Sequence, residues 1–115
     1  MRYRVERAAT VERDLELIFD HLVEAYAAFG ETAKEARSRA GHRIDGIQDS
    51  MMAFEQTPHQ GTLRPELGST TRSVTRSRAV FYFDVDDNLR RVRILAVFFG
   101  GQDHVRHMLK RGDAP

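Results

Sequence analysis

The sequence of 115 residues contains no cysteine. This absence excludes disulfide bonds, thiol catalysis and thiolate zinc sites, so only histidine and carboxylate side chains remain as metal ligands. Long apolar runs are missing as well, because none approaches the ~20 residues that a membrane-spanning helix needs. The N-terminal stretch MRYRVERAA has no apolar core of the kind found in signal peptides. We therefore expect a cytoplasmic protein.

Net charge is also scarce, since 18 basic residues oppose 17 acidic ones and leave a formal charge of only +1. The charge is unevenly spread, at −3 over residues 1–57 and +4 over residues 58–115. Sixteen of the 18 basic residues are arginine, which suits bidentate contacts with carboxylates and phosphates. The basic second half favours an acidic partner, but so small an excess does not indicate nucleic acid.

Length and composition predict one soluble globular domain over residues 1–115, with 41% hydrophobic and 30% charged residues. Alternation around Tyr3 and Val5 predicts a short first strand. Apolar residues at helical spacing then predict a helix that Thr10 caps and Gly30 ends. A second helix follows the capping-box spacing of Thr32 and Glu35 and stops at Thr57-Pro58. Two helices joined so closely should form an antiparallel hairpin.

The second half predicts a loop over residues 59–72 and three strands, at residues 71–76, 79–85 and 92–99. Residues 71–76 are the weakest of these and have the character of an edge strand. Residues 103–111 carry apolar side chains at helical spacing and predict a short C-terminal helix. The order β-α-α-β-β-β with this final helix predicts an α+β fold, in which the helical hairpin packs on a small, mainly antiparallel four-stranded sheet.

Possible chemical sites are few, and we predict no metal and no cofactor. Asp84, Asp86 and Asn88 have the first spacings of a calcium loop, but its glycine and final glutamate are missing, so a hairpin turn explains them better. Asp103, His104 and His107 share one helical turn and could hold a metal, although a helix cap with solvated histidines is the simpler interpretation. Tyr82 lies between two phenylalanines in a predicted strand, and successive side chains of a strand point to opposite faces of the sheet. At least one aromatic ring therefore points away from the core, and either the chain's own tail or a partner must cover it.

Several segments together resemble the RelE/ParE superfamily of toxins from bacterial type II toxin–antitoxin modules. These are the opening YRVERAATVERDLELIFDHL, the segment LRPELGSTTRS and the run FYFDVDDNLRRVRILAVFFGGQD, in that order and with the same succession of elements. The resemblance implies a toxin held inactive by a cognate antitoxin. RelE-like members cut messenger RNA on the ribosome, whereas ParE-like members poison DNA gyrase.

The end of the last strand bears on this division. Cutting members typically place an arginine just beyond the strand and a tyrosine several residues later. Here Gln102 stands about where the arginine would be, and no tyrosine follows. This departure favours the ParE-like branch, a ParD-like antitoxin, and gyrase rather than the ribosome as target. It implies a binding protein rather than an enzyme, with no sequence-specific DNA binding by the toxin alone.

Two sets of candidate site residues follow from this resemblance. If the chain is ParE-like, we expect the partner-binding residues to be Arg72, Arg76, Arg78, Tyr82, Val105, Arg106, Met108 and Leu109. If it is a ribosome-dependent nuclease, the catalytic set would be Arg72, Arg76, His104 and His107. A degenerate toxin that only binds its antitoxin and acts as co-repressor, and an unrelated interaction module, also remain open.

Overall fold

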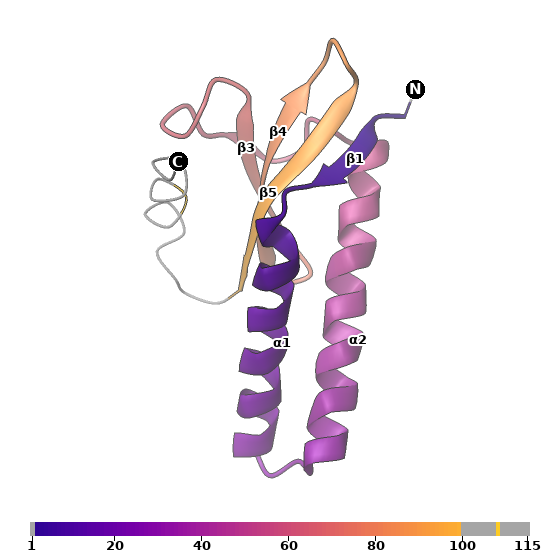
Figure 1. Ribbon diagram of the computed structural model, residues 1–115, viewed down its shortest axis with the longest axis vertical. Coiled ribbons are helices and arrows are strands. Elements are labelled where there is room, and N and C mark those ends of the chain that lie inside the picture. The colour runs from indigo at the N-terminus through magenta and orange to yellow at the C-terminus, as the bar shows by residue number, and fades with distance from the viewer. Residues whose placement is uncertain (1, 100–107, 109–115) are drawn as a thin grey trace.

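The computed structural model describes residues 2–99 and residue 108. Two long helices form an antiparallel hairpin that lies against one face of a sheet (Figure 1). In chain order the elements are β1 (Arg4–Arg7), α1 (Thr10–Ala28), α2 (Ala33–Met52), a 3-10 turn (Ala53–Glu55), β2 (Thr62–Leu63), β3 (Thr71–Arg76), β4 (Ala79–Asp86) and β5 (Arg91–Phe99). The predicted α+β class is confirmed. Neither helix in the described part is long and apolar enough to cross a membrane.

The hairpin is fixed at its tip by the signals that the sequence predicts. Gly30 ends α1 with a φ of +96°, a left-handed conformation in which glycine has no steric penalty. Thr32 then caps α2 through a complete capping box, because its hydroxyl accepts from the Glu35 backbone N–H while the Glu35 carboxylate accepts from the Thr32 N–H. The cap lowers the pKa of Glu35, chiefly through the Thr32 side chain.

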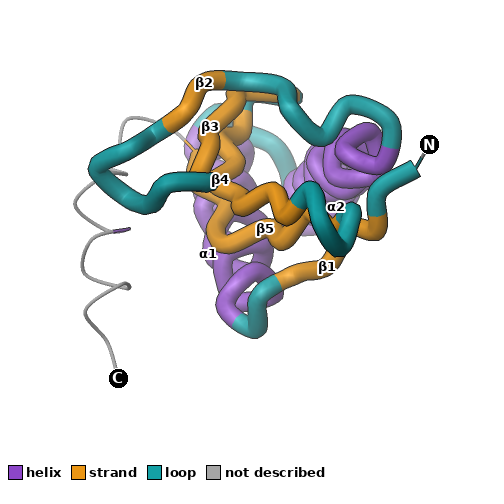
Figure 2. The backbone as a smooth tube through the Cα atoms, turned by 90° about the horizontal axis from the view of Figure 1, so that it is seen from above, coloured by secondary structure: helices purple, strands orange, loops and turns teal. Residues whose placement is uncertain are grey.

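The sheet has five strands in the order β1-β5-β4-β3-β2, one more than predicted (Figure 2). All neighbours are antiparallel except β1 and β5, which run parallel. The additional strand, β2, pairs Thr62 with Ser73 and Leu63 with Arg72. The prediction that residues 71–76 form an edge strand is therefore wrong. A two-residue strand with both side chains exposed leaves no alternation in the sequence by which it could be recognised.

Hydrogen bonding along the edge of β5 that pairs with β1 continues beyond the end of β1, with side chains of α1 as the partners. The last hydrogen bond of this edge along the backbone joins Ala8 N–H to the Ile94 carbonyl. Beyond it, the Thr10 hydroxyl donates to the Leu95 carbonyl at 3.1 Å, and the buried Asp14 carboxylate accepts from Val97 N–H at 3.1 Å. These contacts fall at an irregularity in the β4–β5 register. The expected cap at Thr10 is wrong, because its hydroxyl serves β5 and Ala9 is the N-cap residue, without a side-chain hydrogen bond.

The core lies between the helices and the sheet and contains aromatic rings from the 3-10 turn after α2 and from β4. Phe54 packs edge-on against Phe81 and Phe83, with ring centroids 5.8 and 4.5 Å apart. All three side chains are fully buried. Only the part of the hairpin nearest β1 lies beside the sheet, and the other end extends past the strands (Figure 1). Phe29, at that end, is 89% exposed.

Candidate functional site

The sheet face opposite the helices has an apolar half built from β4 and β5. Tyr82, Ala96, Phe98 and Met108 form a small cluster there, which we call the outer cluster. The rings of Tyr82 and Phe98 meet edge-on with centroids 5.9 Å apart. Met108, from the C-terminal segment, is 8% exposed and Tyr82 is 3% exposed. A residue of the chain's own tail therefore helps to cover the aromatic face, which was one of the two coverings that the sequence predicted.

The other half of this face is polar and contains hydrogen bonds between side chains. The Thr71 hydroxyl donates to Asp84 at 2.6 Å across β3 and β4. Arg64 Nε donates to the Ser73 hydroxyl at 2.8 Å, which holds the loop after β2 on the sheet. Thr71 and Ser73 are both buried, so these bonds satisfy groups that would otherwise be costly to remove from water.

Arg72 and Arg76 do not join Tyr82 in one surface. Arg72 pairs with Phe83 and Arg76 with Ala79, so both project from the helix-side face of β3, whereas Tyr82 projects from the opposite face. Arg72 donates to the backbone carbonyls of His59 at 2.9 Å and Gly61 at 3.5 Å. It thus holds the loop that follows α2 in place.

Two other predicted arginines lie near the turn between β3 and β4. Arg76 is exposed and donates to the neighbouring carbonyl of Thr75. Arg78 lies in the turn itself with a φ of +61° and is exposed. The remaining predicted residues of the tail, which are His104, Val105, Arg106, His107 and Leu109, lie outside the described residues, as does the predicted helix cap at Asp103.

A polar cluster that the sequence did not predict joins the N-terminus to the β4–β5 turn. Tyr3 Oη donates to Asp87 Oδ1 at 2.8 Å, and His59 Nε2 lies 2.7 Å from the same oxygen. The rings of Tyr3 and His59 are edge-on with centroids 5.8 Å apart. The three side chains come from three separate segments, and no spacing in the sequence relates them. The neighbouring Asp86 has the role predicted for it, since its carboxylate accepts from Leu89 N–H and closes the turn.

The hydrogen bonds of this cluster shift the titration of two groups in opposite directions. The bond from Tyr3 lowers the pKa of Asp87, and the bond from His59 lowers it further, with a smaller contribution from the positive charge of Arg72. The same Tyr3–Asp87 bond raises the pKa of the Tyr3 phenol. His59 and Asp87 are exposed, whereas Tyr3 is half-buried. The residues that the structure describes hold no group of three or more ligands placed for a metal ion. The cluster contains groups that can accept, donate and orient protons.

Comparison with known proteins finds similarity at the level of structure alone. No family model matches the chain, and no curated protein sequence matches it. A chain of the chromosomal ParDE TA system from P. aeruginosa superposes with a TM-score of 0.65 at 19% identity, covering 85% of this chain and 96% of that one. The chain has the fold of the RelE/ParE toxins.

Two further structures support this assignment of the RelE/ParE fold. The toxin–antitoxin complex RelBE2 from Mycobacterium tuberculosis gives a TM-score of 0.52 at 19% identity, with coverage of 86% of this chain and 99% of that chain. The isolated RelE toxin from E. coli gives 0.50 at 10% identity, with coverage of 95% and 97%. The matches cover nearly the whole length of each of these three chains.

Proposed function

We propose that this chain is the toxin of a type II toxin–antitoxin module, that it is ParE-like, and that it arrests growth by binding DNA gyrase until a cognate antitoxin neutralises it. The observation that carries the proposal is the match over nearly the whole of a ParDE chain, with a higher TM-score than those for the RelBE2 and RelE structures. The proposal needs no cofactor and no catalytic residue, since inhibition is by binding.

Two features of the chain support the ParE-like branch. The sequence after β5 has Gln102 where cutting members of the superfamily typically have an arginine, and no tyrosine follows it. The formal charge of +1 gives little electrostatic attraction to a ribosome, for which a strongly basic surface would be expected. Both features weaken the case for mRNA cleavage and leave a protein target as the simpler explanation.

Ribosome-dependent mRNA cleavage is the second candidate, and the Tyr3–Asp87–His59 cluster favours it. Attack by a ribose hydroxyl needs a proton acceptor, a proton donor and a cation for the phosphorane. His59, Tyr3 and the nearby Arg72 are groups of those three kinds. Under this alternative, Tyr3→Phe and His59→Gln would abolish toxicity in a protein that still folds.

Expression of the chain in cells without antitoxin, with DNA damage and protein synthesis followed separately, tests the two candidates. The proposal predicts growth arrest with accumulating DNA breaks while translation continues at first. It also predicts rescue by co-expression of the antitoxin encoded beside the gene. Arrest with an immediate stop in translation and cleaved mRNA would replace the gyrase assignment by the nuclease. Unchanged growth would contradict both active-toxin assignments.

A further inference from the structure

The turn between β3 and β4 has a backbone conformation that its two residues rarely adopt. Ser77 and Arg78 have φ values of +54° and +61°, and they connect Arg76 directly to its paired residue, Ala79. Two-residue turns with positive φ at both positions favour asparagine, aspartate and glycine, because most other side chains crowd the backbone in this conformation. The chain therefore bears a steric cost at this turn that glycine would avoid.

Contacts with α2 explain the serine at the first position of the turn. The hydroxyls of Ser77 and Ser50 lie 2.8 Å apart, and the Gly46 carbonyl oxygen lies 3.4 Å from the first and 3.2 Å from the second. Arg43 donates to the Ser77 carbonyl at 3.3 Å. Nothing comparable explains Arg78, because its exposed side chain makes no hydrogen bond or ion pair within the described part of the chain. Its contribution must lie outside the chain.

Three arginines surround Ser77, and none has a carboxylate partner among the residues that the structure describes. Arg76 and Arg78 flank it along the chain, and Arg43 reaches its carbonyl from α2. The Arg43 guanidinium also lies over the Phe99 ring, 5.6 Å from its centroid, which holds it beside the turn. The turn and its support on α2 therefore carry positive charge that the described residues leave without a counterion.

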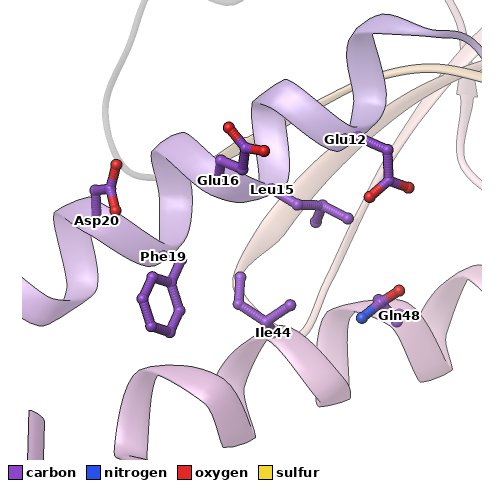
Figure 3. Close-up of a pocket in the computed structure, with 7 residues that line it drawn as sticks. All are labelled: Glu12, Leu15, Glu16, Phe19, Asp20, Ile44 and Gln48. Carbon is purple, nitrogen blue, oxygen red and sulfur yellow. The ribbon is translucent and has the colours of Figure 1, made fainter. Parts of the chain in front are cut away.

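Charge of the opposite sign is concentrated on α1. This helix carries five acidic residues against one arginine. Three of them, Glu12, Glu16 and Asp20, lie along the edge of the groove between α1 and α2 (Figure 3). An anionic partner is repelled by this surface and attracted by the turn, so the distribution of charge fixes which side of the molecule it approaches.

We propose that the β3–β4 turn binds the phosphate backbone of the DNA that gyrase holds, through Arg43, Arg76 and Arg78. This inference rests on the proposed function for the identity of the target. The contact has no sequence preference, because phosphates position a protein on DNA without specifying bases. A formal charge of only +1 attracts free DNA weakly, so the contact forms once gyrase has brought the DNA beside the bound chain.

The composition of the turn favours phosphates over the carboxylates of a protein surface. Residues 75–78 are threonine, arginine, serine and arginine, and all four are exposed. Protein–protein interfaces depend on apolar and aromatic anchors at their centre, and this stretch has none. A DNA strand needs no such anchor, since it presents one negative charge per ~3.4 Å along its length, and hydroxyl and guanidinium groups are its usual partners.

A set of single-residue variants tests the contact. Arg78→Asn removes the charge and keeps a residue that tolerates positive φ, whereas Arg78→Lys keeps the charge. Arg13→Gln is the matched control, because it removes one positive charge from an exposed position on α1. Circular dichroism and thermal denaturation check that each full-length variant folds as stably as wild type.

The measurement is the affinity of each variant for purified gyrase, with and without a bound DNA duplex. At about 100 mM salt we expect Arg78→Asn to weaken binding to the gyrase–DNA complex by about fivefold or more, and binding to DNA-free gyrase by less than about twofold. Arg78→Lys should retain most of the affinity, and Arg13→Gln should change neither value by more than about twofold. The slope of log affinity against log salt for the DNA complex should fall by about 1 in Arg78→Asn.

Three results would overturn the phosphate contact. A loss in Arg78→Asn that is equal with and without DNA would indicate carboxylates of gyrase instead. An Arg78→Asn protein that binds the gyrase–DNA complex as tightly as wild type would remove the turn from the interface and leave the proposed function standing. Wild-type protein that binds gyrase in neither state would overturn the proposed function and this inference with it.

Discussion

Asp87 accepts hydrogen bonds from Tyr3 and His59, and these bonds should make folding stability depend on pH at both ends of the scale. The pKa of Asp87 is lower in the folded chain than in the unfolded one, so its contribution is present above the unfolded value of ~3.9 and is lost as the pH falls through the folded pKa. The pKa of Tyr3 is raised, so the phenol contributes below its unfolded value of ~10 and this contribution is lost as the pH rises through the folded pKa.

Urea denaturation of Asp87→Asn and wild type across pH checks this cluster. The difference in unfolding free energy should be largest near neutral pH and should vanish at strongly acidic pH, where Asp87 is protonated in both states. Asp49→Asn, which changes an exposed carboxylate on α2, serves as the control. A difference between Asp87→Asn and wild type that stays constant across the whole pH range would show that the Asp87 charge has no part in it.

Residue parity within β3 is enough to separate the predicted arginines from Tyr82. Arg72 and Arg76 are separated from the buried Val74 by two residues each, so all three side chains project from the core side of the strand.

The sequence did not reveal the Tyr3–Asp87–His59 cluster, because its members come from a terminus, a loop and a turn whose approach depends on the completed sheet.

At the scale of elements, side chains of α1 form hydrogen bonds with backbone groups of β5 beyond the end of β1, where a paired strand would otherwise do so. Asp14→Ala should leave the buried Val97 N–H without its acceptor and should cost ~1–3 kcal/mol of stability, the usual penalty for an unsatisfied buried donor. Asp14→Asn keeps an acceptor oxygen of the same size and should cost less. Chemical denaturation of both variants measures the difference. Equal losses would mean that the hydrogen bond to β5 is not what Asp14 contributes.

The elements with strong periodicity were predictable, and those fixed by distant contacts were not. The strands at residues 71–76, 79–85 and 92–99 were placed within one residue of β3, β4 and β5. For the last two the reason is a long apolar stretch bounded by turn residues, which permits few other assignments. The Thr32 cap was predictable because both of its hydrogen bonds are made with Glu35, which lies within one turn of helix. Thr10 was misassigned because its acceptor, Leu95, lies 85 residues further along the chain.

For the molecule as a whole, covering of the sheet by Met108 links the C-terminal segment to stability. Met108→Ala should destabilise the fold by ~2–5 kcal/mol, because Met108 is buried in the outer cluster against Tyr82 and Phe98.

His104→Ala and His107→Ala, in contrast, should leave toxicity nearly intact if the chain is a binding protein. Thermal denaturation and growth inhibition by each variant provide the two readouts.

The contrast between these variants separates the two toxin mechanisms. A folded His104→Ala or His107→Ala protein that no longer arrests growth would indicate a nuclease, because loss of a general acid or base removes ~10²–10⁴ of rate without unfolding a protein. A Met108→Ala protein as stable as wild type would show that the tail contributes nothing to covering the outer cluster.

The most direct test of the central claim is an assay of purified DNA gyrase with the purified chain. The reason to propose gyrase as the target is the departure of the sequence after β5 from the pattern of the cutting members. We expect the chain to inhibit supercoiling and to stabilise cleaved DNA on gyrase in proportion to its concentration, and the antitoxin to reverse both effects. Gyrase that remains fully active at saturating toxin, while the same preparation cuts mRNA on translating ribosomes, would contradict the ParE-like assignment.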